Sequence, residues 1–270
     1  MSGWIEGDVT ANGIRIHYYR TGGDKPSVLL AHGVTDNGLC WRPVAEILQA
    51  DYDVIMVDAR GHGLSEATPD GYRYEVLAAD LVGVARALDL QRPALVGHSM
   101  GAATVAEAVA LSSGLARCVV LEDPPWLEVP RTPAQREQRI ERFQANLEKQ
   151  RQMSHQELIE FCRAQSPSWP DNELEAWAQA KHQVSPHVVE LMGGPAQNWR
   201  EIARAIDCPI LLIAADPDRG GIVTPRVADE AATLWRDGRV VTIEGAGHNV
   251  RREGFAPFMS ALTSFLREHS

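Results

Sequence analysis

Residues 97–101 read Gly-His-Ser-Met-Gly, a pattern in which the central serine could act as a nucleophile. An apolar segment at 93–96 precedes the motif and predicts a short buried strand, whereas residues 102–110 predict a helix. A serine on the tight turn between such elements points its hydroxyl into a cleft. The flanking glycines let the strand and the helix approach without Cβ clashes. We therefore predict that Ser99 is a nucleophile.

A serine hydroxyl needs a base that takes its proton and an acid that orients the base. A predicted strand at 240–243 runs into a glycine-rich loop that carries His248, and a predicted amphipathic helix at 255–268 follows. This placement predicts His248 as the general base. His98 lies inside the serine motif, but its neighbouring position is expected to point it away from the cleft of Ser99.

The acid has more than one candidate. A predicted strand at 209–214 is followed by Asp216 and Asp218, and either carboxylate could reach the Nδ1–H of the histidine. We place Asp216 slightly ahead of Asp218 and expect the other to cap the turn or the following helix. A third option is Glu122 or Asp123, at the end of the preceding predicted strand.

Acyl transfer also requires backbone donors aimed at the developing oxyanion. The residue after the nucleophile supplies one donor, here the N–H of Met100. The second should come from the loop that follows the predicted strand at 27–31, and we assign it to the N–H of Val34.

Four segments together carry a resemblance to a known family. They are His-Gly-Val at 32–34, Asp-Ala-Arg-Gly-His-Gly-Leu-Ser at 58–65, the serine motif, and Gly-His at 247–248. In these segments the chain resembles the α/β-hydrolase superfamily, in its ester-hydrolase-like branch. The resemblance implies an α/β fold with a mostly parallel eight-stranded sheet flanked by helices. It also implies that residues 58–65 hold a loop rather than catalyse. A serine acyl-enzyme mechanism requires no metal or organic cofactor.

The order of predicted elements is consistent with that fold. Strands alternate with helices up to residue 123, which predicts a parallel sheet covered on both faces. Residues 124–205 contain helical patterns, prolines and no buried strand pattern, and the alternation then resumes at 209. We predict a core domain at 1–123 and 206–270, with a helical cap at 124–205 inserted after the sixth strand. The alternative is a second helical domain with its own core.

Several residues are candidates for a substrate pocket above Ser99. Trp126 stands where the predicted cap begins, and Trp41 follows the 32–34 loop, which itself contributes His32 and Gly33. Most aromatic side chains of the cap must pack its underside. A pocket lined by one or two of them would suit a small apolar or aromatic substrate.

The composition limits the partners and the compartment. The 270 residues carry a net charge of −10, which argues against nucleic acid or anionic membrane surfaces as partners. The sequence contains neither a secretory signal pattern nor a membrane-spanning apolar run. Four scattered cysteines favour reduced thiols of a cytoplasmic protein over a metal site or disulfides. The sequence does not indicate the oligomeric state.

These features predict a serine hydrolase that cleaves a carboxylic ester through a Ser-His-Asp triad and an acyl-enzyme. Lactones, carbamates and amides remain open as substrates. Acyl transfer, perhydrolysis or carbon–carbon bond hydrolysis could use the same residues. A ligand receptor on a hydrolase fold is a further alternative, although such proteins often lose a triad residue, and candidates for all three are present here.

Overall fold

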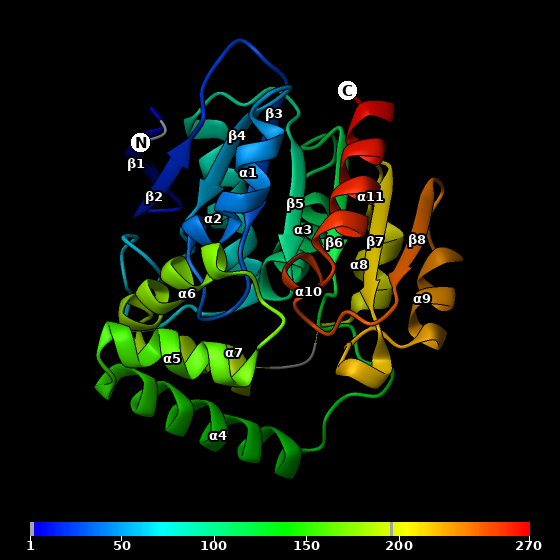
Figure 1. Ribbon diagram of the computed structural model, residues 1–270. Coiled ribbons are helices and arrows are strands. Elements are labelled where there is room, and N and C mark those ends of the chain that lie inside the picture. The colour runs from blue at the N-terminus through cyan, green and yellow to red at the C-terminus, as the bar shows by residue number, and fades with distance from the viewer. Residues whose placement is uncertain (1–2, 195–196) are drawn as a thin grey trace.

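The computed structural model describes residues 3–194 and 197–270, and its centre is one eight-stranded sheet (Figure 1). In space the strands follow the order β1-β2-β4-β3-β5-β6-β7-β8. Their bounds are β1 Ile5–Ala11, β2 Ile14–Arg20, β3 Ser27–Ala31, β4 Asp53–Val57, β5 Ala94–His98, β6 Cys118–Glu122, β7 Ile210–Ala215 and β8 Gly238–Ile243. The predicted α/β fold with a mostly parallel eight-stranded sheet is confirmed.

The antiparallel part of the sheet is an N-terminal hairpin. Strands β1 and β2 pair with Ala11 opposite Ile14, so that Asn12 and Gly13 form the turn. Both turn residues have positive φ, 48° and 81°, as a two-residue hairpin turn of the twist-compatible type requires. This hairpin pairs antiparallel with β4 and forms one edge of the sheet.

From β4 to β8 every pairing is parallel, so the carboxyl ends of these strands lie along one edge. Strand β5, which leads into Ser99, lies between β3 and β6. The loops that follow β3 and β6 therefore flank Ser99 on its two sides. In an open parallel sheet, ligands bind beyond this carboxyl edge where the strand order reverses, and here the order reverses between β3 and β5.

Helices cover both faces of the sheet (Figure 1). Apolar residues of α1 and α11 share one buried cluster with one face, and residues of α2, α3, α8 and α9 share another with the opposite face. The bounds of the helices outside the segment between β6 and β7 are α1 Arg42–Leu48, α2 Tyr74–Ala87, α3 Met100–Leu111, α9 Pro225–Ala232, α10 Val250–Glu253 and α11 Phe255–Glu268, with the 3-10 helices η1 Gly38–Trp41 and η3 Pro217–Arg219.

Between β6 and β7 lies a segment of residues 124–205, here called the insert, whose described part contains helices and loops but no strand. Its elements are α4 Pro133–Gln152, α5 His155–Gln165, α6 Asp171–Gln183, η2 Pro186–Val189, α7 Glu190–Gly193 and α8 Trp199–Ala205. Capping boxes at Thr132 and Ser154 define the starts of α4 and α5. Figure 1 shows α4 to α7 grouped beyond one end of the sheet.

The two parts of the insert pack differently. Leu158, Cys162, Leu174 and Trp177 form a small buried cluster between α5 and α6. Helix α8 instead places Trp199 and Ala203 in the cluster on the sheet face. Among the described residues, no helix combines the length and apolarity that crossing a membrane would require.

Candidate active site

Ser99 lies on a strained turn between β5 and α3. Its backbone has φ 51° and ψ −112°, a region that non-glycine residues rarely adopt. The two motif glycines are required by close packing, because a Cβ on Gly97 would lie 2.4 Å from the Gly101 carbonyl carbon and one on Gly101 only 2.1 Å from the Ala31 oxygen. The turn therefore has the geometry of a nucleophile elbow.

His248 lies in the loop after β8, beside Ser99. Its Nε2 is 3.0 Å from the Ser99 hydroxyl oxygen, and its Nδ1 is 2.6 Å from Oδ2 of Asp123. The histidine side chain is 30% exposed, whereas the Asp123 side chain is fully buried. This is the hydrogen-bonded order of nucleophile, base and orienting acid that acyl transfer uses.

Asp123 directly follows β6, the strand next to β5. Its φ of 39° turns the chain at the strand end, and its backbone N–H donates to the Ile213 carbonyl. The carboxylate also accepts hydrogen bonds from the backbone N–H groups of Ile222 and Val223, with the shortest at 2.9 Å. These donors and His248 together fix the orientation of the carboxylate.

The loop after β3 approaches Ser99 from the other side. A Cβ on Gly33 would lie 3.6 Å from the Cβ of Ser99, so this loop is in close contact with Ser99. The ring of His32 holds the loop, since its Nδ1–H donates to the Gly33 carbonyl and its Nε2 accepts from the N–H of Ala59. Val34 is half-buried beside Met100 in one apolar cluster.

Residues 58–65 support that loop. The Asp58 carboxylate accepts hydrogen bonds from the N–H groups of Gly38 and Leu64, and the Ser65 hydroxyl donates to the Asp58 carbonyl. Arg60 forms a buried two-point ion pair with Asp80 on α2. These contacts fasten the loop after β4 to the core.

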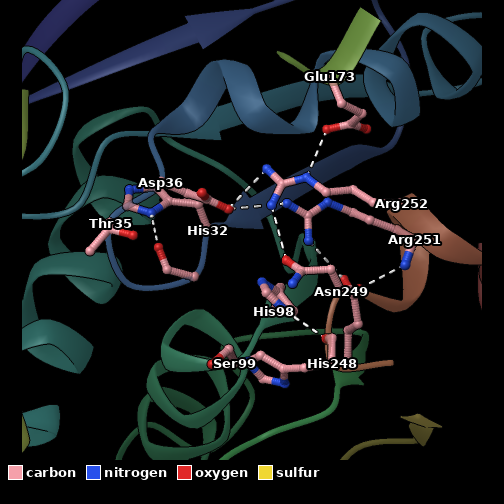
Figure 2. Close-up of polar contacts among 12 residues, drawn as sticks. His32, Thr35, Asp36, His98, Ser99, Glu173, His248, Asn249, Arg251 and Arg252 are labelled. Carbon is pink, nitrogen blue, oxygen red and sulfur yellow. Dashed lines mark hydrogen bonds and ion pairs between the residues drawn. The ribbon is translucent and has the colours of Figure 1, made fainter. Parts of the chain in front are cut away.

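A buried cluster of charged side chains adjoins the site (Figure 2). It contains three acids and three bases, each at most 4% exposed, and we call it the ion cluster: Asp36, Glu122, Glu173, Lys181, Arg251 and Arg252. Asp36 is its centre and lies within ion-pair distance of all three bases. Burial alone would raise the Asp36 pKa, but Arg252, Lys181 and Arg251 hold it well below its usual value.

The arginines of the ion cluster directly follow the His248 loop. Arg251 contacts Glu122 through its backbone N–H and its side chain, and Arg252 contacts Glu173 of α6 at 2.9 Å. His98 lies between this cluster and the site, and its Nε2–H donates to the His248 carbonyl at 3.0 Å (Figure 2). Burial, with Arg251 and His248 nearby, holds the His98 pKa well below its usual value, so the ring is neutral.

A cavity of about 240 Å³ lies within the insert, between the chain that follows Asp123 and the region of α7 and α8. Arg131, Arg136 and Arg139 line it, together with Tyr74 and Met192, which also pack in the apolar cluster around Met100. Burial and the nearby Arg131 lower the pKa of Arg139. Within residues 3–194 and 197–270, none of the three arginines has an acidic side chain within ion-pair distance.

Comparison with known sequences decides the family. The sequence model described as the alpha/beta hydrolase family matches residues 28–259. The chain belongs to the alpha/beta hydrolase family. It is an enzyme of the hydrolase class, as its named relatives are.

Two curated relatives match this hydrolase over nearly its whole length. N-formylmaleamate deformylase of Pseudomonas putida is 33% identical, over 96% of each chain. The 2-(acetamidomethylene)succinate hydrolase of Mesorhizobium japonicum is 26% identical, over 92% of this chain and 90% of the relative. A solved structure of N-formylmaleamic acid deformylase from Pseudomonas putida superposes with a TM-score of 0.82, at 27% identity, covering 96% of this chain and all of the other.

The structure corrects the predicted acid of the hydrolase. Asp216 accepts hydrogen bonds from the N–H groups of Asp218 and Gly245, so its carboxylate caps the turns after β7 and β8. Asp218 lies on an exposed 3-10 turn. Neither contacts His248, and the alternative Asp123 does. The physical reason is how each carboxylate is held. The N–H groups of two turns engage Asp216, whereas the positive φ of Asp123 at the end of β6 brings its carboxylate to His248.

The predicted pocket tryptophans are also in the wrong place for that role. Trp126 is 1% exposed and stacks on Trp199 in the core cluster of the sheet face. Trp41 is fully buried under the Arg251 guanidinium, 4.2 Å from the ring centroid. His32 is buried and holds the loop, whereas Gly33 does lie against Ser99.

The ion cluster was missed from the sequence, although one of its residues had a signal. Leu174, Trp177 and Lys181 have the spacing of one helix face, so Lys181 falls on the apolar side of α6. Arg251 and Arg252 lie in a four-residue helix, which is too short for any periodicity to indicate their burial. Among the described residues, no group of three or more His, Cys, Asp or Glu side chains could hold a metal ion.

Proposed function

We propose that this hydrolase cleaves an acyl bond, an ester or an N-acyl group, of a small carboxylate-bearing compound through a Ser99 acyl-enzyme. The observation that carries the proposal is the hydrogen-bonded series Ser99, His248 and Asp123, with 3.0 Å and 2.6 Å between the partners. The helical insert acts as a cap over the site.

The chemistry follows from the geometry. The Ser99 oxygen attacks the acyl carbon while His248 Nε2 takes the hydroxyl proton, and the buried Asp123 stabilises the resulting imidazolium. The N–H groups of Met100 and Val34 hold the oxyanion. The tetrahedral intermediate collapses, and His248 gives its proton to the departing oxygen or nitrogen. Water, deprotonated by His248, then attacks the acyl-enzyme and releases the carboxylic acid and Ser99.

Two observations support a carboxylate on the substrate. The named substrates of the two curated relatives, N-formylmaleamate and 2-(acetamidomethylene)succinate, are both carboxylates with an N-acyl group. The cavity beside the Met100 cluster is lined by Arg131, Arg136 and Arg139. Arginine is suited to carboxylate recognition, because its planar fork can donate two parallel hydrogen bonds. We assign the substrate carboxylate to this cavity, in place of a purely apolar or aromatic substrate.

A matched pair of substrates tests the proposal. Mono-p-nitrophenyl succinate carries a carboxylate, and p-nitrophenyl butyrate is a neutral ester of similar length. We expect turnover of both to be abolished in Ser99→Ala and the charged ester to have the higher kcat/KM. The double variant Arg136→Gln/Arg139→Gln should lower kcat/KM about 10- to 100-fold for the charged ester alone, as loss of hydrogen bonds to a charged group implies. Equal losses for both esters would contradict the assignment of the cavity.

A further inference from the structure

Thr35, the residue after the proposed oxyanion donor Val34, has an unfavourable backbone conformation. Its φ is 66°, in the left-handed region, and threonine is β-branched. A branched residue is disfavoured there, so the surrounding structure must hold it. The Asp36 N–H donates to the Gly33 carbonyl at 3.1 Å, so Val34 and Thr35 are the two central residues of one turn. The conformation of Thr35 therefore helps to set how this turn presents the Val34 N–H.

Lys181 supplies the side-chain contacts that hold Thr35, whose own N–H donates to His62 Nε2 at 3.4 Å. Its Nζ donates to the Thr35 carbonyl at 2.7 Å and to the Thr35 hydroxyl at 2.9 Å, and it lies 3.4 Å from Asp36 Oδ1. The lysine is 2% exposed, and its ammonium also lies over the Trp177 ring. All three of its polar contacts are therefore to two consecutive residues of the loop after β3.

We infer that Lys181, on α6 of the insert, is a positioning residue that holds Thr35 in the left-handed conformation and thereby orients the N–H of Val34 toward the oxyanion. The inference rests on the proposed serine mechanism and goes beyond it, because it makes α6 of the insert part of the catalytic assembly.

The ion cluster extends the same connection to the base. Asp36 accepts from Lys181 on one oxygen and from Arg251 and Arg252 on the other. Because those arginines begin three residues after His248, one carboxylate joins α6, the oxyanion loop and the histidine loop. A second hydrogen bond also joins α6 to this loop, because Asn37 Nδ2 donates to Gln183 Oε1 at 2.9 Å.

The test measures the maximal rate at which Lys181→Met hydrolyses p-nitrophenyl acetate. This rate is divided by the concentration of Ser99 sites, which is titrated to completion with a fluorophosphonate. We expect kcat per titrated site to fall about 100-fold, comparable with loss of one oxyanion donor, and KM to change little. The matched control is Lys149→Met, which changes an exposed lysine of α4 and should leave kcat unchanged.

Two further variants separate positioning from general stability. Thr35→Gly removes the cost of the positive φ, so in the Lys181→Met background it should restore part of the lost kcat. If Lys181→Met fails to fold, Lys181→Met/Glu173→Gln keeps the ion cluster electrically balanced and should show the same low kcat per site.

The outcomes are distinct. If the wild type is labelled at Ser99 and kcat per site is unchanged in Lys181→Met and in Lys181→Met/Glu173→Gln, the positioning role alone is overturned. A loss of kcat that Thr35→Gly does not relieve would also overturn it. A wild-type protein that is neither labelled nor active would overturn the proposed function and this inference together.

Discussion

Asp123 accepts a hydrogen bond from Nδ1 of His248 across 2.6 Å, although the two residues lie 125 positions apart in the chain. The carboxylate has no solvent exposure, and the backbone N–H groups of Ile222 and Val223 donate to its two oxygens. A buried, fully hydrogen-bonded carboxylate holds one tautomer of the imidazole, with the proton on Nδ1 and Nε2 free to take a proton from Ser99.

This relationship makes the identity of the acid testable. We expect Asp123→Asn to lower kcat by about 10⁴-fold, because an amide in this position favours the wrong histidine tautomer. Asp216→Asn is the matched control and should leave kcat close to that of the wild type, since Asp216 accepts its hydrogen bonds from turn N–H groups. Steady-state kinetics on an activated ester measures both. A large loss in Asp216→Asn with none in Asp123→Asn would reverse the assignment.

Trp126 should behave as a core residue. Its ring is stacked on Trp199 at 5.2 Å between centroids, and it is 1% exposed. We expect Trp126→Ala to lower the free energy of unfolding by about 3–5 kcal/mol, the usual cost of truncating a buried tryptophan. The KM of the folded variant should change little. Chemical denaturation and kinetics at low temperature check the two statements, and a raised KM at unchanged stability would restore Trp126 to the pocket.

Two buried histidines should make the fold sensitive to acid. In both His32 and His62 one ring nitrogen donates to a carbonyl, and the other accepts from a backbone N–H, so neither ring can take a second proton without losing a hydrogen bond. Burial, and secondarily the nearby His32, lowers the His62 pKa to about 3. Burial also lowers the pKa of His32.

The lowered pKa values of His32 and His62 determine how the stability of the fold changes with pH. The unfolded chain binds protons near pH 6.5, where the folded chain does not, so stability is present above that pH and is lost as the pH falls. Between pH 6.5 and 5, His62 should account for about 2 kcal/mol of lost stability. Urea denaturation of the wild type and of His62→Gln at both pH values measures the difference. Identical pH dependence in the two proteins would contradict the account.

Much of the fold could be predicted from local patterns. Asn12-Gly13 between alternating residues indicated the hairpin, and the glycines around Ser99 indicated the close strand–helix approach that the structure has. The choice of acid depended on which strand-end carboxylate reaches His248, and that contact joins residues 125 positions apart in the chain. Asp123 also adopts a positive φ, and no local sequence pattern indicated this conformation.

The arrangement of charges was harder to predict than the fold. Charged side chains are usually solvated, so Asp36, Arg251 and Arg252 were not predicted to be buried. Their burial is tolerated because Lys181 and Glu173 arrive from a helix more than 130 positions from Asp36 in the chain and complete the ion pairs. Only the assembled tertiary structure brings these partners together.

The proposed mechanism requires that Ser99 is an activated nucleophile. Its most direct test is mass spectrometry of the protein after reaction with a fluorophosphonate, which forms an oxygen–phosphorus bond to the serine as fluoride leaves. We expect one adduct per chain, on the peptide that contains Ser99, with no adduct in Ser99→Ala and much slower labelling in His248→Asn. An unlabelled wild-type protein, or labelling that persists in Ser99→Ala, would contradict it.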